Sequence, residues 1–356
     1  MNPVRNSPPQ RPKGRASAGA ISNGVKPFIA PISARVYSFG IMKKVVRIGG
    51  GSGGFTLLRG LKEFPLDITA VFTSFDSGGS AGILRDELGV LPPGDVRRGL
   101  LALADEKQAE ILRELLNFRF ENGNSSLHGH SFGNLFLVAL SSIYGGEIEG
   151  IQKASELLNI KGKIFPVSLD QSQVHAILED GTEIVGETNV DVPKHDGNLR
   201  IKKVFLDPPA RIYEGTDKAI READIVVIGP GDLYSSIVPT LLTTGMKEAL
   251  QATNGKTVVV CNLMTKWGET NDFTASDMVH ELLQYSGLAK FDYAICNTKE
   301  IDTRLAKSYA KEKKHPMRCD SVLSEYARKV ITGDFFLAAD IARHDSEKRH
   351  EGRAIH

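Results

Sequence analysis

Glycine-rich loops that directly follow short apolar segments constrain the fold of this chain more than any other feature. In the first case, Lys44–Ile48 has the character of a short buried strand, Gly49–Gly54 follows it, and Phe55–Lys62 carries leucines at helical spacing. Glycine lets the backbone approach a phosphate closely, and the N-terminus of the next helix offers free N–H groups. The run matches GxGxxG but lacks the lysine of a P-loop. We predict a loop that contacts a phosphate or nucleotide, with a merely tight turn as the alternative.

The same order recurs along the chain and predicts the fold class. Further candidates for buried strands are Ile68–Phe75, Ile225–Ile228, Thr257–Cys261 and Tyr293–Cys296. Strands that alternate with helices indicate an α/β protein with a Rossmann-like, doubly wound, mainly parallel sheet and helices on both faces. In such a sheet the loops after the strands open onto one edge, where ligands bind.

Residues from about 160 to 205 follow a different pattern. Three short strand candidates, Val174–Leu178, Glu183–Glu187 and Ile201–Phe205, are separated by two dipeptides. These dipeptides, Asp180-Gly181 and Asp196-Gly197, favour hairpin turns. We therefore expect a small β-rich insertion beside the main sheet.

Two more glycine loops and one polar loop follow predicted strands. The second glycine loop runs from Asp76 to Gly82, and Asp76 is placed to bind a ribose or a metal ion, with helix capping as the alternative. The third glycine loop runs from Gly229 to Ser236. The loop from Asn262 to Thr270 offers polar groups for a sugar or base. Four such loops at one edge predict a nucleotide or phosphate-ester site.

Several other residues allow both a functional and a structural interpretation. Asp95 is placed to cap a helix over Val96–Ala104, and Arg97 in its first turn hints at an anionic partner. His128 and His130 resemble a metal-binding pair, but no third ligand is apparent, so structural histidines are favoured. No nucleophile–base pair stands out. The chain's 3 cysteines are far apart in sequence, which argues against a zinc ribbon or disulfide scaffold and fits a reducing cytosol.

The two ends of the chain differ from its body. Residues 1–41 hold six basic residues, no acidic residue and six of the 16 prolines. We expect a disordered tail there, translated from upstream of a natural start at Met42; a transit peptide and a nucleic-acid arm are the alternatives. We expect one α/β domain over 42–345 and a second disordered tail over 346–356. The body is mildly acidic and has no apolar run long enough for a membrane span, so neither nucleic acid nor a membrane is an expected partner.

Five long motifs resemble the YvcK branch of the CofD-like superfamily. They are GGGSGGFTLLRGLK, DSGGSAGILRDELGVLPPGDVRRGLLALA, GHSFGNLFLVAL, IGPGDLYSSIVPTLL and NLMTKWGETNDFTASD, in this order. The resemblance extends from Met42 to about Asp345 and implies a Rossmann-like core that binds a nucleotide diphosphate. Members of this branch are known as gluconeogenesis factors. The resemblance implies a cytoplasmic UDP-sugar-binding regulator, required for cell shape and wall synthesis on gluconeogenic carbon sources, without a secure catalytic activity.

The resemblance also implies which residues contact the ligand. Those that match the family's ligand motifs are Gly49, Gly50, Gly51, Ser52, Gly53, Asp76, Gly78, Gly79, Ser80, Asn134, Gly229, Gly231, Tyr234 and Ser236. Thr265 belongs to the polar loop after the third apolar strand. Late in the chain, Arg343 resembles the arginine associated with UDP-sugar binding, and the spacing selects Tyr309 as its tyrosine partner. A surface-helix residue is the alternative for Tyr309.

Five positions depart from the family pattern. Ser52 stands where threonine is usual, and Ser77 where many members have a second aspartate, which weakens a magnesium site. Asp232 replaces a common serine, and it would repel a diphosphate unless it turns away or shares a cation. Lys266-Trp267 replace the usual glutamine-proline.

The sequence leaves other functions open. The superfamily also contains magnesium-dependent transferases that move 2-phospho-lactate from a guanosine diphosphate donor, so a transferase with magnesium at Asp76 is the alternative function. No cofactor follows from the sequence otherwise. An NAD-dependent dehydrogenase fits GxGxxG but none of the other loops. UDP-N-acetylglucosamine or UDP-glucose is the expected ligand, with wall-synthesis proteins and a second copy of the chain as possible partners.

Overall fold

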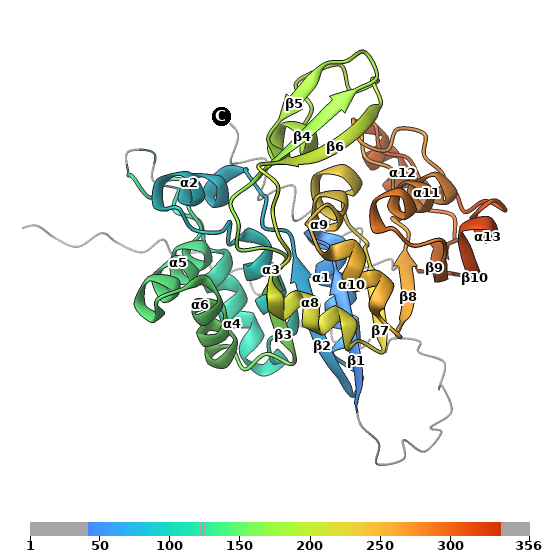
Figure 1. Ribbon diagram of the computed structural model, residues 1–356. Coiled ribbons are helices and arrows are strands. Elements are labelled where there is room, and N and C mark those ends of the chain that lie inside the picture. Colours follow the sequence, from blue (N-terminus) through green and yellow to red (C-terminus); the bar gives the residue numbers. More distant parts are fainter. Residues whose placement is uncertain (1–41, 122, 124, 336–356) are drawn as a thin grey trace, which may run out of the picture. The chain divides into compact units, whose positions relative to one another are not determined.

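A computed structural model describes residues 42–121, 123 and 125–335. It contains one sheet of seven parallel strands in the order β10-β9-β8-β7-β1-β2-β3 (Figure 1). The strands are β1 (Lys43–Ile48), β2 (Leu66–Phe72), β3 (Lys163–Pro166), β7 (Ile225–Ile228), β8 (Lys256–Val260), β9 (Phe291–Asn297) and β10 (Ala327–Gly333). The predicted α/β fold with a doubly wound parallel sheet is confirmed.

Helices cover both faces of this sheet, and each face has its own apolar core. One core joins Ile68, Ala70 and Phe72 of β2 to one group of helices, and the other core includes Val71 of the same strand. Successive side chains of a strand point to opposite faces, so β2 serves both cores. The first group consists of α1 (Gly51–Leu61), α3 (Gly94–Leu103), α4 (Glu106–Asn117), α5 (Phe132–Tyr144) and α6 (Glu147–Leu157).

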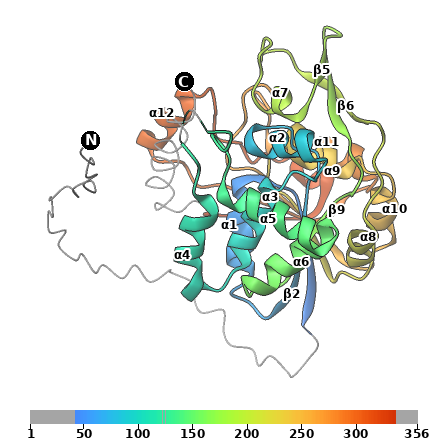
Figure 2. The same ribbon diagram turned by 90° about the vertical axis from the view of Figure 1, so that its left-hand side faces the viewer.

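The second core is formed mainly by helices from the later half of the chain (Figures 1 and 2). These are α8 (Glu214–Arg221), the π-helical turn η1 (Leu233–Ile237), α9 (Val238–Leu241), α10 (Met246–Ala252), α11 (Ala275–Ser286) and α13 (Leu323–Tyr326). The helices α2 (Gly79–Leu88) and α12 (Thr303–Lys311) complete the elements around the sheet. No described helix combines the length and the apolar character that crossing a membrane requires.

The predicted β-rich insertion is a three-stranded antiparallel sheet in the order β5-β4-β6. Its strands are β4 (Gln173–Leu178), β5 (Glu183–Val185) and β6 (Ile201–Asp207), with the short helix α7 (Glu187–Asp191) between the last two. Two details of the prediction are wrong. The insertion begins after β3, since residues 163–166 pair with β2 in the main sheet. Asp180-Gly181 does form the expected hairpin turn, but Asp196-Gly197 joins α7 to β6, because β4 takes the central place between β5 and β6.

Helix boundaries also differ from the prediction at the glycine loops. α1 begins at Gly51, so the last four residues of the predicted loop form the helix's first turn. α3 begins at Gly94, with Pro93 at its N-cap position. Asp95 therefore lies inside the first turn, and its predicted role as the N-cap is wrong. A carboxylate in the first turn needs no capping geometry to be stabilised by the helix dipole, which leaves its side chain free for other contacts.

Candidate functional site

The candidate site lies where the strand order of the main sheet reverses. From β1 the chain proceeds outward through β2 to β3 and then returns to β7 on the other side of β1. Ligands of open α/β sheets bind beyond the carboxyl ends of the strands at such a switch point. The first glycine loop (49–54) follows β1, and the third glycine loop (229–236) follows β7, so both lie at this point.

The two loops are packed directly against each other. A Cβ atom on Gly231 would lie 3.1 Å from the carbonyl oxygen of Gly50, and one on Gly53 would lie 3.0 Å from Cγ of Pro230. Asn262 holds Gly231 in place, because its Oδ1 accepts from the Gly231 amide at 3.1 Å and its Nδ2 donates to the Gly231 carbonyl at 2.8 Å. At Gly231 the absence of a side chain lets the two backbone segments approach closely.

A buried arginine that sequence reasoning missed ties these loops together. Arg47 in β1 is 0% exposed, and its guanidinium donates to the carbonyls of Gly49, Gly50, Gly229 and Pro230, the last at 2.7 Å. Burial lowers the pKa of Arg47 to about 10, so it remains charged at neutral pH. An arginine between Val46 and Ile48, within the apolar part of the strand, was the available signal.

The second glycine loop (76–82) presents Asp76 to a carboxyl group from the insertion. Asp76 Oδ1 accepts from the Gly78 amide at 2.8 Å, and its carboxylate shares a hydrogen bond with Glu187 of α7. Burial and the charge of Asp76 raise the pKa of Glu187 to about 9, and burial also raises the pKa of Asp76. Glu187 is thus protonated at neutral pH and donates to Asp76. Nothing in the local sequence around Glu187 indicated this contact.

Asp95 contacts the first glycine loop instead of capping its own helix. Its Oδ1 accepts from the Gly51 amide at 3.4 Å and lies 3.4 Å from Nη1 of Arg98. A Cβ atom on Gly50 would lie 2.0 Å from Oδ2 of Asp95. The neighbouring Arg97 is buried and donates to Asn117 Oδ1 at 2.6 Å. Its partners are therefore within the chain, and the suggestion of an anionic partner for Arg97 finds no support.

A buried polar triad lies at the start of α2. Ser80 Oγ is 3.1 Å from Nδ1 of His130 and accepts from Nδ2 of Asn134 at 3.1 Å. All three side chains are buried, and Oδ1 of Asn134 has no partner in the described part of the chain. Sequence reasoning identified Ser80 and Asn134 but not their direct contact, nor the contact of Ser80 with His130. Exposed His128 lies outside this triad.

The third glycine loop differs from the other two because a carboxylate caps the turn that follows it. Glu269 accepts from the amides of Tyr234 at 2.6 Å and Ser235 at 3.2 Å, and from Oγ of Ser235 at 2.8 Å. Tyr234 is buried in the apolar core, whereas Ser236 Oγ is buried, has no partner among the residues that the structure describes, and faces Gly50. The third loop thus forms a wall of the site.

The remaining predicted residues lie at different distances from the switch point. Thr265 is buried and bonds to His315, with its amide donating to the His315 carbonyl at 2.7 Å and its Oγ1 accepting from the His315 amide at 2.9 Å. Tyr309 is half-buried on α12, which follows β9 at the same edge of the sheet. Arg343 lies outside the described residues. Asp232 does share a cation, since its carboxylate lies 2.9 Å from Nζ of Lys266.

Side chains of metal-ligating types form no ready-made metal site in the described ranges. No group of three histidine, cysteine, aspartate or glutamate residues there is arranged to hold a metal ion. Asp76 with Glu187 is the pair nearest the glycine loops, and magnesium commonly uses one or two carboxylates together with substrate phosphates. These two residues would therefore hold such an ion only together with a ligand.

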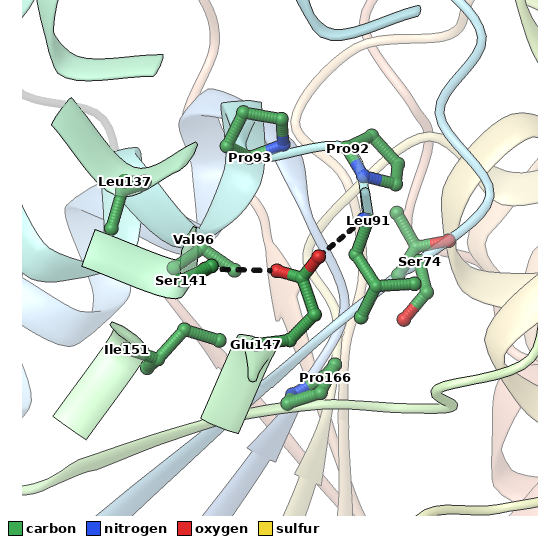
Figure 3. Close-up of a pocket in the computed structure, with 11 residues that line it drawn as sticks. Ser74, Leu91, Pro92, Pro93, Val96, Leu137, Ser141, Glu147, Ile151 and Pro166 are labelled. Atoms are coloured by element: carbon green, nitrogen blue, oxygen red, sulfur yellow. Dashed lines mark hydrogen bonds between the residues drawn. The ribbon is translucent and has the colours of Figure 1, made fainter. Parts of the chain in front are cut away.

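A separate cavity of about 20 Å³ lies between α3, α5 and α6 (Figure 3). Glu147 closes it and accepts from the Leu91 amide at 3.0 Å and Ser141 Oγ at 3.2 Å, while burial raises its pKa. The volume suffices for one water molecule, so this cavity is not a ligand site.

Comparisons of the sequence and of the structure with known proteins point to the same family. The sequence pattern described as 2-phospho-L-lactate transferase CofD matches residues 45–336. A gluconeogenesis factor from Halalkalibacterium halodurans is 42% identical over 317 residues, which cover 87% of this chain and 95% of the relative. The gluconeogenesis factor of Bacillus subtilis is 40% identical over 309 residues, 86% of this chain and 95% of that protein. The crystal structure of protein BH3568 from Bacillus halodurans matches with a TM-score of 0.78 and 39% identity, over 85% of this chain and 99% of that one.

Proposed function

The chain belongs to the CofD family, among its gluconeogenesis factors, and from this premise we propose that it is a regulatory protein that binds a UDP-sugar at the switch point. UDP-N-acetylglucosamine and UDP-glucose are the proposed ligands. Binding would report the supply of UDP-sugars to cell-wall synthesis during gluconeogenic growth in the cytoplasm, with wall-synthesis proteins or a second copy of the chain as partners.

The observation that carries this proposal is the difference between the N-termini at the three glycine loops. The N-cap residues of α1 and α2, Gly50 and Gly78, make no side-chain cap, and neither helix has an acidic residue in its first turn. Asp95 from α3 reaches the Gly51 amide of α1 only at 3.4 Å. Glu269, in contrast, occupies the first amides of η1. Helix N-termini with free N–H groups attract phosphates. The first and second loops are therefore the proposed diphosphate site, and Asn134 with its unpaired Oδ1 is a candidate for hydrogen bonds to the rest of the ligand.

Calorimetric titration of the full chain tests the proposal. UDP-N-acetylglucosamine, UDP-glucose and GDP are titrated separately, each with and without magnesium. We expect uridine-selective binding with micromolar dissociation constants and no turnover of the ligand. Binding of another nucleotide while both UDP-sugars fail would contradict the proposal.

The Asp76–Glu187 pair supports the alternative function, a magnesium-dependent 2-phospho-L-lactate-type transferase. Two adjacent carboxyls are a candidate site for a magnesium ion that also contacts a diphosphate donor. A transferase of this kind would bind GDP only with magnesium, and Asp76→Asn would lose both the magnesium dependence and any turnover. An Asp76→Asn variant unchanged in both would remove this alternative.

A further inference from the structure

One ammonium group beside the third glycine loop is shared among three carboxylates. Nζ of Lys266 contacts Asp191, lies 2.9 Å from Oδ2 of Asp232 and lies 3.3 Å from Oε1 of Glu269. The three carboxylates come from α7 of the insertion, from the third glycine loop and from the loop after β8. A single side chain thus joins three segments at the carboxyl edge of the sheet.

The three carboxylates have different access to solvent. The Glu269 side chain is 0% exposed and already accepts from two backbone amides, so its position is set by the fold. The Asp232 side chain is 42% exposed and directly follows Gly231, which touches Gly50 of the first loop. The Asp191 side chain, at 34%, is also partly exposed, but it lies on α7 of the insertion. Because Asp232 adjoins the first loop through Gly231, it is the carboxylate that an incoming ligand at that loop would meet.

The net charge of Lys266 and its three carboxylates determines whether this cluster attracts or repels an anionic ligand. One ammonium against three carboxylates leaves an excess of negative charge next to the proposed diphosphate site. Like charges at this range repel, and the repulsion increases as the site loses water. An anionic ligand is repelled by Asp232 and attracted by the same ammonium that Asp232 occupies.

We propose that the Asp232–Lys266 pair sets the affinity of the site for anionic ligands, because Asp232 and the ligand compete for the Lys266 ammonium. The inference rests on the proposed function for the location of the ligand, and it adds the residues that tune its binding. Lys266 pairs with Asp232 when no ligand is bound, and it would attract the phosphates of a ligand when one enters.

The direction in which Asp232→Asn changes the ligand affinity distinguishes this proposal from a merely structural role of the pair. Asp232→Asn removes the competitor and keeps the shape, so UDP-N-acetylglucosamine should bind roughly 3-fold to 10-fold more tightly. Lys266→Gln removes the cation and should weaken binding by a similar factor. The double variant should lie between the two. If the pair only supports the loop, Asp232→Asn should weaken binding instead.

The chain provides a matched control pair at the amino end of β7, opposite the end that leads into the third glycine loop. Lys43 and Asp224 form an ion pair of 2.7 Å at the amino end of the sheet, and the Asp224 side chain is 34% exposed. Asp224→Asn makes the same change in net charge far from the site and should leave affinity within about 2-fold. Uridine, which carries no phosphate, should bind all variants alike.

The measurement is calorimetric titration of the full-length variants with UDP-N-acetylglucosamine, uridine and inorganic pyrophosphate, with thermal denaturation as a folding check. If Lys266→Gln fails to fold because Glu269 loses its cation, Asp232→Asn still carries the test. Unchanged or weaker binding of anions by Asp232→Asn would overturn the inference. Wild-type protein that binds pyrophosphate but no UDP-sugar would contradict the proposed function alone, and the order of the variants would then be read with pyrophosphate. Wild-type protein that binds no anion would overturn both.

Discussion

At the scale of single residues, the site depends on charged groups that are buried together with a specific partner. Arg47 is paired with backbone carbonyls, Glu269 with backbone amides and Glu187 with another carboxyl. An unpaired buried charge is costly, and partners of this kind make burial tolerable. Because each partner lies in a different segment, these residues link the glycine loops and the insertion into one site.

Glu187 makes the stability of the protein depend on pH. Its pKa is about 9 in the folded chain against an ordinary value of 4.5, so folding takes up a proton between these values. The stabilising contribution is complete below pH 4.5 and is lost as pH rises through 9. Glu187→Gln keeps an uncharged donor at every pH, so its melting temperature should exceed that of the wild type by a margin that grows from pH 5 to pH 9 and is on the order of 10 °C at pH 9.

Thermal denaturation across this pH range checks the Glu187 prediction. Glu63→Gln is the matched control, since Glu63 is exposed and lies in the turn after α1. Its melting curve should follow that of the wild type at each pH. A constant offset between Glu187→Gln and wild type at all pH values would show that the carboxyl is ionised in the folded protein.

At the scale of elements, each glycine loop ends inside the first turn of a helix, and the helices differ in how their first amides are satisfied. α1 and α2 have no side-chain cap, whereas Glu269 caps η1. α5 has an ordinary cap, because Ser131 accepts from the Asn134 amide. Glu269 lies 2.6 Å from the Tyr234 amide of η1, whereas Asp95 lies 3.4 Å from the Gly51 amide of α1. The N-termini proposed to bind phosphate are thus held less closely by side chains, and the same sequence pattern serves two different purposes.

The glycines of α1 provide a test of packing within one helix. A Cβ atom on Gly54 would lie 2.0 Å from Nη2 of Arg47, while one on Gly60 would meet nothing within 4 Å. Gly54→Ala should therefore lower the free energy of unfolding by about 1–3 kcal/mol through overpacking. Gly60→Ala in the same helix should raise it by about 0.5–1 kcal/mol, because alanine is the better helix former.

Chemical denaturation of both alanine variants measures these differences. Since Arg47 also holds the carbonyls of both loops, we expect Gly54→Ala to weaken UDP-sugar binding and Gly60→Ala to leave it unchanged. Equal stability of the two variants would mean that the Arg47 guanidinium can move without cost.

At the scale of the whole molecule, the insertion contacts the main domain on both sides of the switch point. α7 begins at Glu187, which contacts Asp76 of the second loop, and ends at Asp191, which contacts Lys266 beside the third loop. Trp267 packs against Gly197 of the insertion. One five-residue helix therefore bridges both sides of the site, and changes there should be felt at both glycine loops.

The fold also gathers three cysteines that are dispersed in the sequence. The thiol of Cys296 shares hydrogen bonds with the thiols of Cys261 and Cys319, and none of the three forms a disulfide. Burial and the neighbouring Cys296 raise the pKa of Cys319 to about 12, so little thiolate exists at pH 8. We expect native protein to react with a thiol reagent at least 10-fold more slowly than protein unfolded in urea. Rapid labelling of one native thiol, lost in Cys319→Ser, would contradict this.

The sequence by itself determined the order of strands, glycine loops and helices, and with it the parallel sheet and the edge at which its loops open. It also identified the family, because five long motifs retain their order. These features are local: periodicity, loop composition and the next helix can be read within a few residues. Asp76, Ser80 and Asn134 were found in this way as candidate site residues.

Only the tertiary structure decided how the site is held and charged. Arg47 binds a carbonyl 183 positions away, Gly51 binds Asp95 at a separation of 44, and Ser77 contacts Thr188 at 111. The same holds for Glu187 at Asp76 and Lys266 at Asp232, and it explains why the N-cap expected at Asp95 is wrong. Partners so far apart leave no local pattern, because their meeting depends on the strand order and on where the insertion packs. The physical reason is that a buried charge must be paired with a group close to it in space, and the folded arrangement of distant segments determines which group that is.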